Sequence, residues 1–198
     1  MPIRVAVQWA VDLALDLGQL MESPGEPATA RSEPCWERPP LEWFKCNADG
    51  AFYDQQWKGA TGVVLRDDSG VFVRGIAKWY EHCLDALTME ALACRDGLAM
   101  ALQLGIQKVW LESDCQEVVR LWQVRDQQRS SVMSILKEIK ELSTLFQEFK
   151  FSFPSRSCNR VAHALAKQVT CETRVGWWSI APACVSGLLS SDCNPPYN

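Results

Sequence analysis

The sequence has few of the patterns that assign a protein to a class at once. Its nine cysteines are odd in number and contain no C-x-x-C pair, so they indicate neither a zinc ribbon nor a complete disulfide framework. No run of about 18 uncharged apolar residues exists, because the most apolar N-terminal stretch, Val5 to Leu20, is interrupted by Gln8, Asp12 and Asp16. This pattern argues against a membrane span and against a secretory signal. We therefore expect an intracellular protein with reduced cysteines, in either the nucleus or the cytoplasm.

A basic excess is missing as well. The formal net charge is −4, and between Leu41 and Thr170 the basic and acidic residues balance at 16 each. A strongly basic nucleic-acid footprint is therefore absent. What is present is ordinary globular composition, 47% apolar and 22% charged. A chain of 198 residues is long enough for one domain with a sizeable core and tails.

The chain divides into four segments by composition. Residues 1–20 carry polar side chains at helical spacing among apolar ones and predict an amphipathic helix. Residues 21–40 hold five of the ten prolines and predict a linker. We expect the folded domain at 41–170, a C-terminal tail at 171–198, and a chain beginning near Pro40 that still folds.

The alternation of apolar and polar residues and the helical periodicity predict an α/β domain with one mixed sheet. Turn chemistry at 67–70 joins the second and third strands, Gly105 ends the first helix, and Ser113 with Gln116 forms a capping box that opens the next helix. The predicted strands are 43–52, 60–66, 71–80, 108–111 and 149–153, and the other predicted helices are 88–104, 132–146 and 158–169. This order indicates an antiparallel start followed by crossover units in one sheet.

Three acidic residues stand where these elements meet. Asp49 lies in the first strand on the face opposite its apolar residues, where an acid either faces water or takes part in function. Glu90 and Asp114 fall in the first turns of predicted helices, where the helix dipole alone explains a carboxylate. Taken together, however, the three can converge at one edge of the sheet. Converging carboxylates repel one another unless a cation binds, so convergence predicts a metal site.

Four motifs, in this order, resemble a known family. They are Cys-Asn-Ala-Asp-Gly-Ala-Phe at 46–52, Thr-Met-Glu-Ala-Leu-Ala at 88–93, Glu-Ser-Asp-Cys at 112–115 and Asn-Arg-Val-Ala-His-Ala-Leu-Ala at 159–166. Over the predicted domain the chain resembles the type 1 ribonuclease H domain, in the short plant form related to non-LTR retroelements. The resemblance implies the ribonuclease H-like fold, an α/β fold with a mixed five-stranded sheet flanked by helices.

The resemblance also implies two divalent ions, Mg²⁺ or Mn²⁺, bound by four acids. Three of these positions are Asp49, Glu90 and Asp114, with Asp49 as the ligand shared by both ions. The fourth falls on His163, which we expect to be a weak or substitute ligand among the four catalytic residues. Because neutral imidazole supplies neither the charge nor the hard oxygen that Mg²⁺ prefers, this position puts magnesium-dependent activity in question. A histidine that the family often has before the last helix is replaced by Phe153.

The implied reaction is hydrolysis of the RNA strand of an RNA–DNA hybrid, in which metal ions ~3.5–4 Å apart activate a water molecule. Recognition would come through groove shape, phosphates and 2′-hydroxyl groups. Arg160, His163 and Lys167 share one helix face, so Arg160 and Lys167 are candidate phosphate contacts, although a solvated face is the commoner cause. Trp177 and Trp178 are expected to pack back onto the domain. We expect a monomer whose partner is the hybrid.

Two other hypotheses remain open. A retroelement-derived domain that binds nucleic acid but has lost turnover fits His163 and Phe153. A non-enzymatic interaction module would use the N-terminal helix and carry the acids as surface charges. An exonuclease of the same broad fold is disfavoured, because Asp49 is followed by Gly50 and Ala51, whereas those enzymes carry an Asp-x-Glu pair in the first strand.

Overall fold

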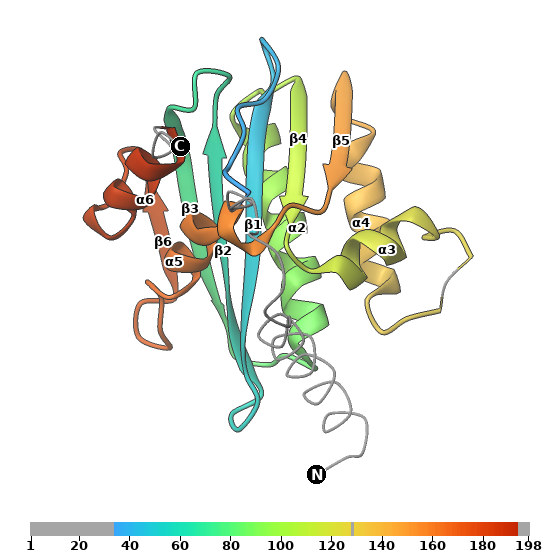
Figure 1. Ribbon diagram of the computed structural model, residues 1–198. Coiled ribbons are helices and arrows are strands. Elements are labelled where there is room, and N and C mark those ends of the chain that lie inside the picture. Colours follow the sequence, from blue (N-terminus) through green and yellow to red (C-terminus); the bar gives the residue numbers. More distant parts are fainter. Residues whose placement is uncertain (1–33, 128, 194–198) are drawn as a thin grey trace, which may run out of the picture. The chain divides into compact units, whose positions relative to one another are not determined.

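The computed structural model describes residues 34–127 and 129–193. The helix expected at 1–20 and most of the expected linker lie outside these residues. The described chain forms a six-stranded mixed sheet in the order β5-β4-β1-β2-β3-β6 (Figure 1). Its strands are β1 (Phe44–Tyr53), β2 (Lys58–Arg66), β3 (Phe72–Tyr80), β4 (Lys108–Ser113), β5 (Glu148–Ser152) and β6 (Val175–Trp178). The predicted class is confirmed, with one strand more than the five expected.

The first three strands form an antiparallel meander, to which β4 and β5 add in parallel. Asp67 closes the turn between β2 and β3, since its Oδ1 accepts hydrogen bonds from the backbone N–H groups of Ser69 at 3.0 Å and Val71 at 2.8 Å. Gly70 in this turn has a φ of 82°, which favours glycine. The hairpin predicted from turn chemistry is therefore confirmed.

Within the described residues, five helices and one 3-10 turn accompany the sheet. They are α2 (Ala86–Gln103), α3 (Gln116–Gln123), α4 (Met133–Ser143), η1 (Arg156–Cys158), α5 (Arg160–Ala166) and α6 (Ala183–Cys193). α2 begins earlier than predicted because Asp85 caps it, accepting a hydrogen bond from the backbone N–H of Thr88 at 2.7 Å. Glu90 therefore lies in the second turn of α2 and not in the first. Gly105, with a φ of 70°, follows the helix end as expected.

The capping box predicted at Ser113 and Gln116 is wrong. Cys115 is the N-cap of α3, no side chain caps this helix, and Asp114 precedes it. Ser113 is instead the last residue of β4, and its Oγ donates a hydrogen bond to Glu90 at 3.3 Å. Ser113 is therefore held in place by its pairing in β4 and not by a role as a helix cap.

Helices cover both faces of the sheet. α2 and α4 share the larger core with one face, on which Cys46 and Ala48 of β1 lie fully buried. α5 and α6 pack on the other face around Val64 and Leu165. Figure 1 shows α5 in front of the central strands and α2 behind them. β1 is therefore enclosed from both sides.

β6 and α6 come from the segment beyond residue 170, where the sequence predicted only a tail. β6 pairs with β3 so that Trp177 lies opposite Ile76, and Trp178 packs against the cluster around α5. Trp178 thus packs onto the domain as expected, whereas the Trp177 side chain is 51% exposed. The helix predicted at 158–169 is shorter, because η1 precedes α5 and the helix ends at Ala166.

The membrane and cysteine expectations can be compared only with the described residues. None of the described helices is long and apolar enough to span a bilayer. Eight of the cysteines are free thiols in the described ranges, four of them buried.

Candidate metal centre

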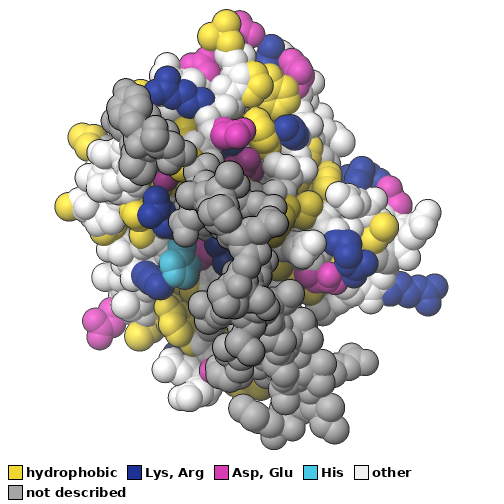
Figure 2. Space-filling model, viewed as in Figure 1, with side chains coloured by type: hydrophobic (Ala, Val, Ile, Leu, Met, Phe, Trp, Pro, Cys, Tyr) yellow, Lys and Arg dark blue, Asp and Glu magenta, His cyan; other side chains and the backbone are white. Residues whose placement is uncertain are grey.

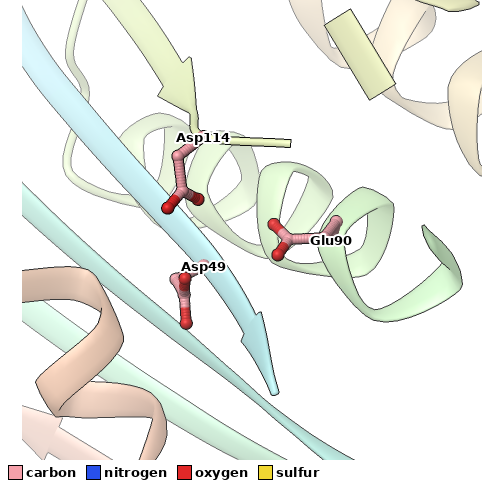
Figure 3. A group of neighbouring side chains, drawn as sticks. All are labelled: Asp49, Glu90 and Asp114. Carbon is pink, nitrogen blue, oxygen red and sulfur yellow. The ribbon is translucent and has the colours of Figure 1, made fainter. Parts of the chain in front are cut away.

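Three carboxylates from three separate elements meet at one edge of the sheet. Asp49 comes from β1, Glu90 from α2, and Asp114 from the residue directly after β4, and Figure 3 shows the three groups pointing toward one another. One oxygen from each lies within 4.8 Å of one oxygen from each of the others. The structure thus brings together the acids that the sequence singled out. The group could hold a metal ion.

The strand register explains why the two aspartates meet. β1 and β4 run parallel with Ala48 opposite Ser113, so Asp49 and Asp114 each directly follow a residue of this pair. Gly50 then admits α2 to this edge, because a Cβ at this glycine would lie 2.4 Å from the backbone carbon of Met89. This close approach of helix to strand places Glu90 beside the aspartates.

The cluster is electrostatically costly without a cation. Burial raises the pKa of Glu90 well above its usual range, and the negative charges of Asp49 and Asp114 raise it further. Burial and the neighbouring Asp49 also raise the pKa of Asp114. A divalent cation would remove the repulsion, and carboxylate oxygens are the hard ligands that Mg²⁺ and Mn²⁺ accept. The donor set therefore fits the implied ions.

Asn159 ties the last helix to this cluster. Its Nδ2 donates to the backbone oxygen of Ala48 and to Oδ1 of Asp114, both at 2.9 Å, and the residue is 1% exposed. Its own Oδ1 is buried and accepts no hydrogen bond from the described residues. In the sequence, Asn159 stands out only as the first residue of a motif, although its place at the N-cap of α5 could have suggested a polar role.

His163 stands beside Asp49, at the side of the cluster that faces α5. Its Nδ1 lies 3.1 Å from Oδ2 of Asp49, and its side chain is 54% exposed. The hydrogen bond to Asp49 raises the pKa of His163, because it favours the charged imidazolium. α5 can approach so closely because Gly62 pairs with Asp49 in the sheet, and a Cβ at Gly62 would lie 2.2 Å from the backbone oxygen of Ala162.

The two predicted phosphate contacts lie on the exposed side of α5. Arg160 and Lys167 are both exposed. Arg160 is also held in place, since its Nη2 donates to Ser191 at 3.1 Å and lies 3.5 Å from the carboxylate of Asp192. Figure 2 shows basic side chains bordering a histidine on this face. Phe153, at the position of the missing histidine, is 47% exposed.

Comparison with known proteins agrees with this geometry. The model of the reverse transcriptase-like family matches residues 47–169, which include all four motifs apart from Cys46. No protein of curated function matches the sequence.

Solved structures share the fold at low sequence identity. RNase H1 of the archaeon Halobacterium salinarum is 22% identical with a TM-score of 0.59, covering 64% of this chain and 96% of that one. The N-terminal RNase H domain of a Mycobacterium tuberculosis protein is 18% identical with a TM-score of 0.58, covering 63% and 91%. LC11-RNase H1, solved in complex with an RNA/DNA hybrid, is 17% identical with a TM-score of 0.57, covering 64% and 95%. The chain belongs to the reverse transcriptase-like family, and its fold is that of ribonuclease H.

Proposed function

We propose that the domain hydrolyses the RNA strand of RNA–DNA hybrids in a reaction that depends on divalent metal ions. The observation that carries this proposal is the convergence of Asp49, Glu90 and Asp114 within 4.8 Å at a sheet edge. Asp49 is buried, Glu90 and Asp114 are partly buried, and the repulsion among the three opposes folding unless a cation binds. The family match and the hybrid-bound structure of LC11-RNase H1 support the choice of substrate.

The carboxylates and their neighbours have distinct roles in this proposal. A divalent cation would act as a Lewis acid and lower the pKa of a bound water molecule. Asp49, Glu90 and Asp114 would hold it, with Asp49 as the shared ligand if two ions bind. Asn159 holds the carboxylate of Asp114 in one orientation through its 2.9 Å hydrogen bond. His163 is the fourth catalytic residue and contacts Asp49 directly.

Substrate contacts would come mainly from the exposed side of α5. Arg160 and Lys167 carry positive charge on the same side of the domain as His163, where hybrid phosphates would pass. Recognition by groove shape and 2′-hydroxyl groups suits a domain with a balanced charge. We propose a monomer inside the cell. Descent from a plant non-LTR retroelement is a proposal that the sequence motifs alone support.

One observation favours a second function, binding of nucleic acid without turnover. The imidazole of His163 lies 3.1 Å from Oδ2 of Asp49, and when protonated it supplies a positive charge where the family has an acid. The charge of the imidazolium offsets part of the repulsion among the carboxylates and so weakens the binding of a cation. Under this alternative Arg160 and Lys167 keep their phosphate contacts while cleavage is lost.

A cleavage assay separates the two functions. A hybrid labelled on its RNA strand is incubated with the full chain in Mg²⁺, in Mn²⁺ and in a chelator, beside single-stranded RNA and duplex DNA. Metal-dependent cleavage of the hybrid RNA alone supports the proposal. Retention of the hybrid on the protein in all three conditions, with intact RNA throughout, would establish the binding-only function.

A further inference from the structure

Residues 34–40, here called the N-terminal strap, lie against the face of the sheet that carries Asp49. Trp36 in the strap is 4% exposed, and its Nε1 donates to Oδ1 of Asn47 at 3.0 Å. Pro39 is buried as well. The strap precedes the family match, which begins at residue 47. It is therefore a feature of this chain outside the shared domain.

The strap covers a layer of charged side chains that solvent does not reach. Lys45 is 2% exposed and pairs with Glu112 at 3.0 Å, while Nδ2 of Asn47 donates to the same carboxylate at 2.9 Å. Burial lowers the pKa of Lys45, although Glu112 opposes the shift. The Lys45 ammonium group also lies 4.0 Å from the ring centroid of Trp110. Such groups are stable only while their partners stay in place.

Arg66 joins the strap to the C-terminal end of the described chain. Its guanidinium carbon lies 3.6 Å from the ring centroid of Trp36, and Nη2 donates to Asn47 at 3.0 Å. Its Nη1 pairs with Asp192 of α6 at 2.7 Å. Asp192 in turn lies 3.5 Å from Nη2 of Arg160 at the start of α5. Two segments from outside the family match thus meet at one buried cation.

The strap also binds the turn that leads into the candidate metal centre. The backbone oxygen of Pro34 accepts hydrogen bonds from Oγ of Ser157 at 2.6 Å and from Sγ of Cys158 at 3.3 Å. These two residues belong to η1, and Asn159, which holds Asp114, follows directly. Strap, η1 and α5 therefore form a continuous set of contacts from Trp36 to the carboxylates.

We propose that the N-terminal strap positions the start of α5, and that Trp36 acts through Asn159 as a positioning residue for hybrid cleavage. The contacts of the Trp36 side chain are with Asn47, Arg66 and Lys45. It fixes Arg66 and Asn47, while the Pro34 carbonyl fixes η1. With both contacts made, Asn159 is held at Asp114. This inference rests on the proposed function for its effect on turnover but not for its effect on α5.

Three variants of the full chain test the inference. Trp36→Ala removes the stacking on Arg66 and the hydrogen bond to Asn47, and Trp36→Phe keeps the stacking alone. Ser157→Ala removes one donor to the Pro34 carbonyl from a partly exposed position and leaves the core intact. The matched control is Trp57→Ala, because Trp57 is 61% exposed. Each variant is compared with the wild type in amide hydrogen exchange and in cleavage kinetics with Mn²⁺.

The expected result is a local change together with a split in the kinetics. Trp36→Ala should speed exchange in residues 156–166 while α4 stays protected, and lower kcat by about tenfold with little change in KM. Trp36→Phe should recover most of kcat, Ser157→Ala should lose less in the same direction, and Trp57→Ala should match the wild type. Exchange that rises equally in α4, or an unchanged kcat in Trp36→Ala, overturns the inference. If the wild type cleaves no hybrid, the proposed function fails, and the exchange contrast alone decides the role of the strap.

Discussion

His163 places its Nδ1 3.1 Å from Oδ2 of Asp49, so that an imidazole contacts the carboxylate that begins the candidate metal centre. The contact joins α5 to β1 across the pairing of Asp49 with Gly62. Its partner, Asp49, is 4% exposed, whereas the imidazole is largely open to solvent. A positive charge at this point competes with a metal ion for the same oxygen atoms.

The first prediction concerns this position. The wild type should cleave a hybrid poorly in Mg²⁺ and relatively better in Mn²⁺, because Mn²⁺ accepts imidazole nitrogen more readily. His163→Asp restores a negative charge and an oxygen ligand, and should raise the magnesium-supported rate by about tenfold or more. The rate is measured on a labelled hybrid at saturating Mg²⁺.

Asp49→Asn in the His163→Asp background is the control for this gain. Loss of the shared ligand Asp49 should abolish the gain in the magnesium-supported rate. The gain cannot come from helix stability, because His and Asp have similar helix propensities. A His163→Asp protein that binds hybrid as before yet cleaves nothing with either metal would sink the prediction and favour the binding-only function.

The second prediction concerns pH in the absence of added metal. Because the hydrogen bond to Asp49 raises the folded-state pKa of His163 above the unfolded value of about 6.5, the pair stabilises the fold below that pH. This contribution is lost as the pH rises through the folded-state pKa. NMR titration of the imidazole resonances should show a His163 midpoint above about 6.5 that falls in Asp49→Asn. An unchanged midpoint in the variant would show that Asp49 is not the cause.

The third prediction tests the close approach of α2 to β1. Gly50→Ala should lower the free energy of unfolding by about 1–3 kcal/mol, because the new Cβ would overlap the backbone of Met89. Cleavage should fall as well, since Glu90 moves with the helix. Gly187→Ala in α6 is the matched control, as nothing lies within 4 Å of its Cβ position. There the substitution should stabilise by about 0.5–1 kcal/mol, and equal effects at both sites would refute the argument.

The fourth prediction adds a stability cost to the expectation that a chain beginning near Pro40 still folds. A chain beginning at Pro40 lacks Trp36 and uncovers Lys45, Asn47 and Arg66, so we expect it to lose about 3–5 kcal/mol of stability. Thermal unfolding of this chain and of the full chain provides the measurement. Equal melting temperatures would mean that the strap contributes no stability.

The sequence predicted several elements of the fold well, because each of them depends on residues close together in the chain. The strand β1, the turn at Asp67 and the end of α2 before Gly105 each depend on neighbouring residues, and each was confirmed. The convergence of Asp49 and Asp114 followed from parallel pairing, which the strand order implies. Family motifs supplied the rest of the cluster.

The polar layer beneath the strap could not be predicted in the same way. Lys45 and Asn47 alternate with apolar residues and suggest a solvated face, yet both are buried. Their partners Trp36, Glu112 and Arg66 come from distant parts of the chain, and no periodicity connects them. α6 was missed for a related reason, because small and serine residues give it no clear amphipathic face.

Direct binding of Mn²⁺, followed by electron paramagnetic resonance, tests whether Asp49, Glu90 and Asp114 form a metal site, without relying on turnover. The full chain is titrated beside Asp49→Asn, Glu90→Gln and Asp114→Asn, with Asp54→Asn as the control because Asp54 is an exposed acid outside the cluster. The wild type and the control should bind Mn²⁺ saturably, and each cluster variant should lose about tenfold or more in affinity. Equal binding by all five proteins would contradict the metal centre.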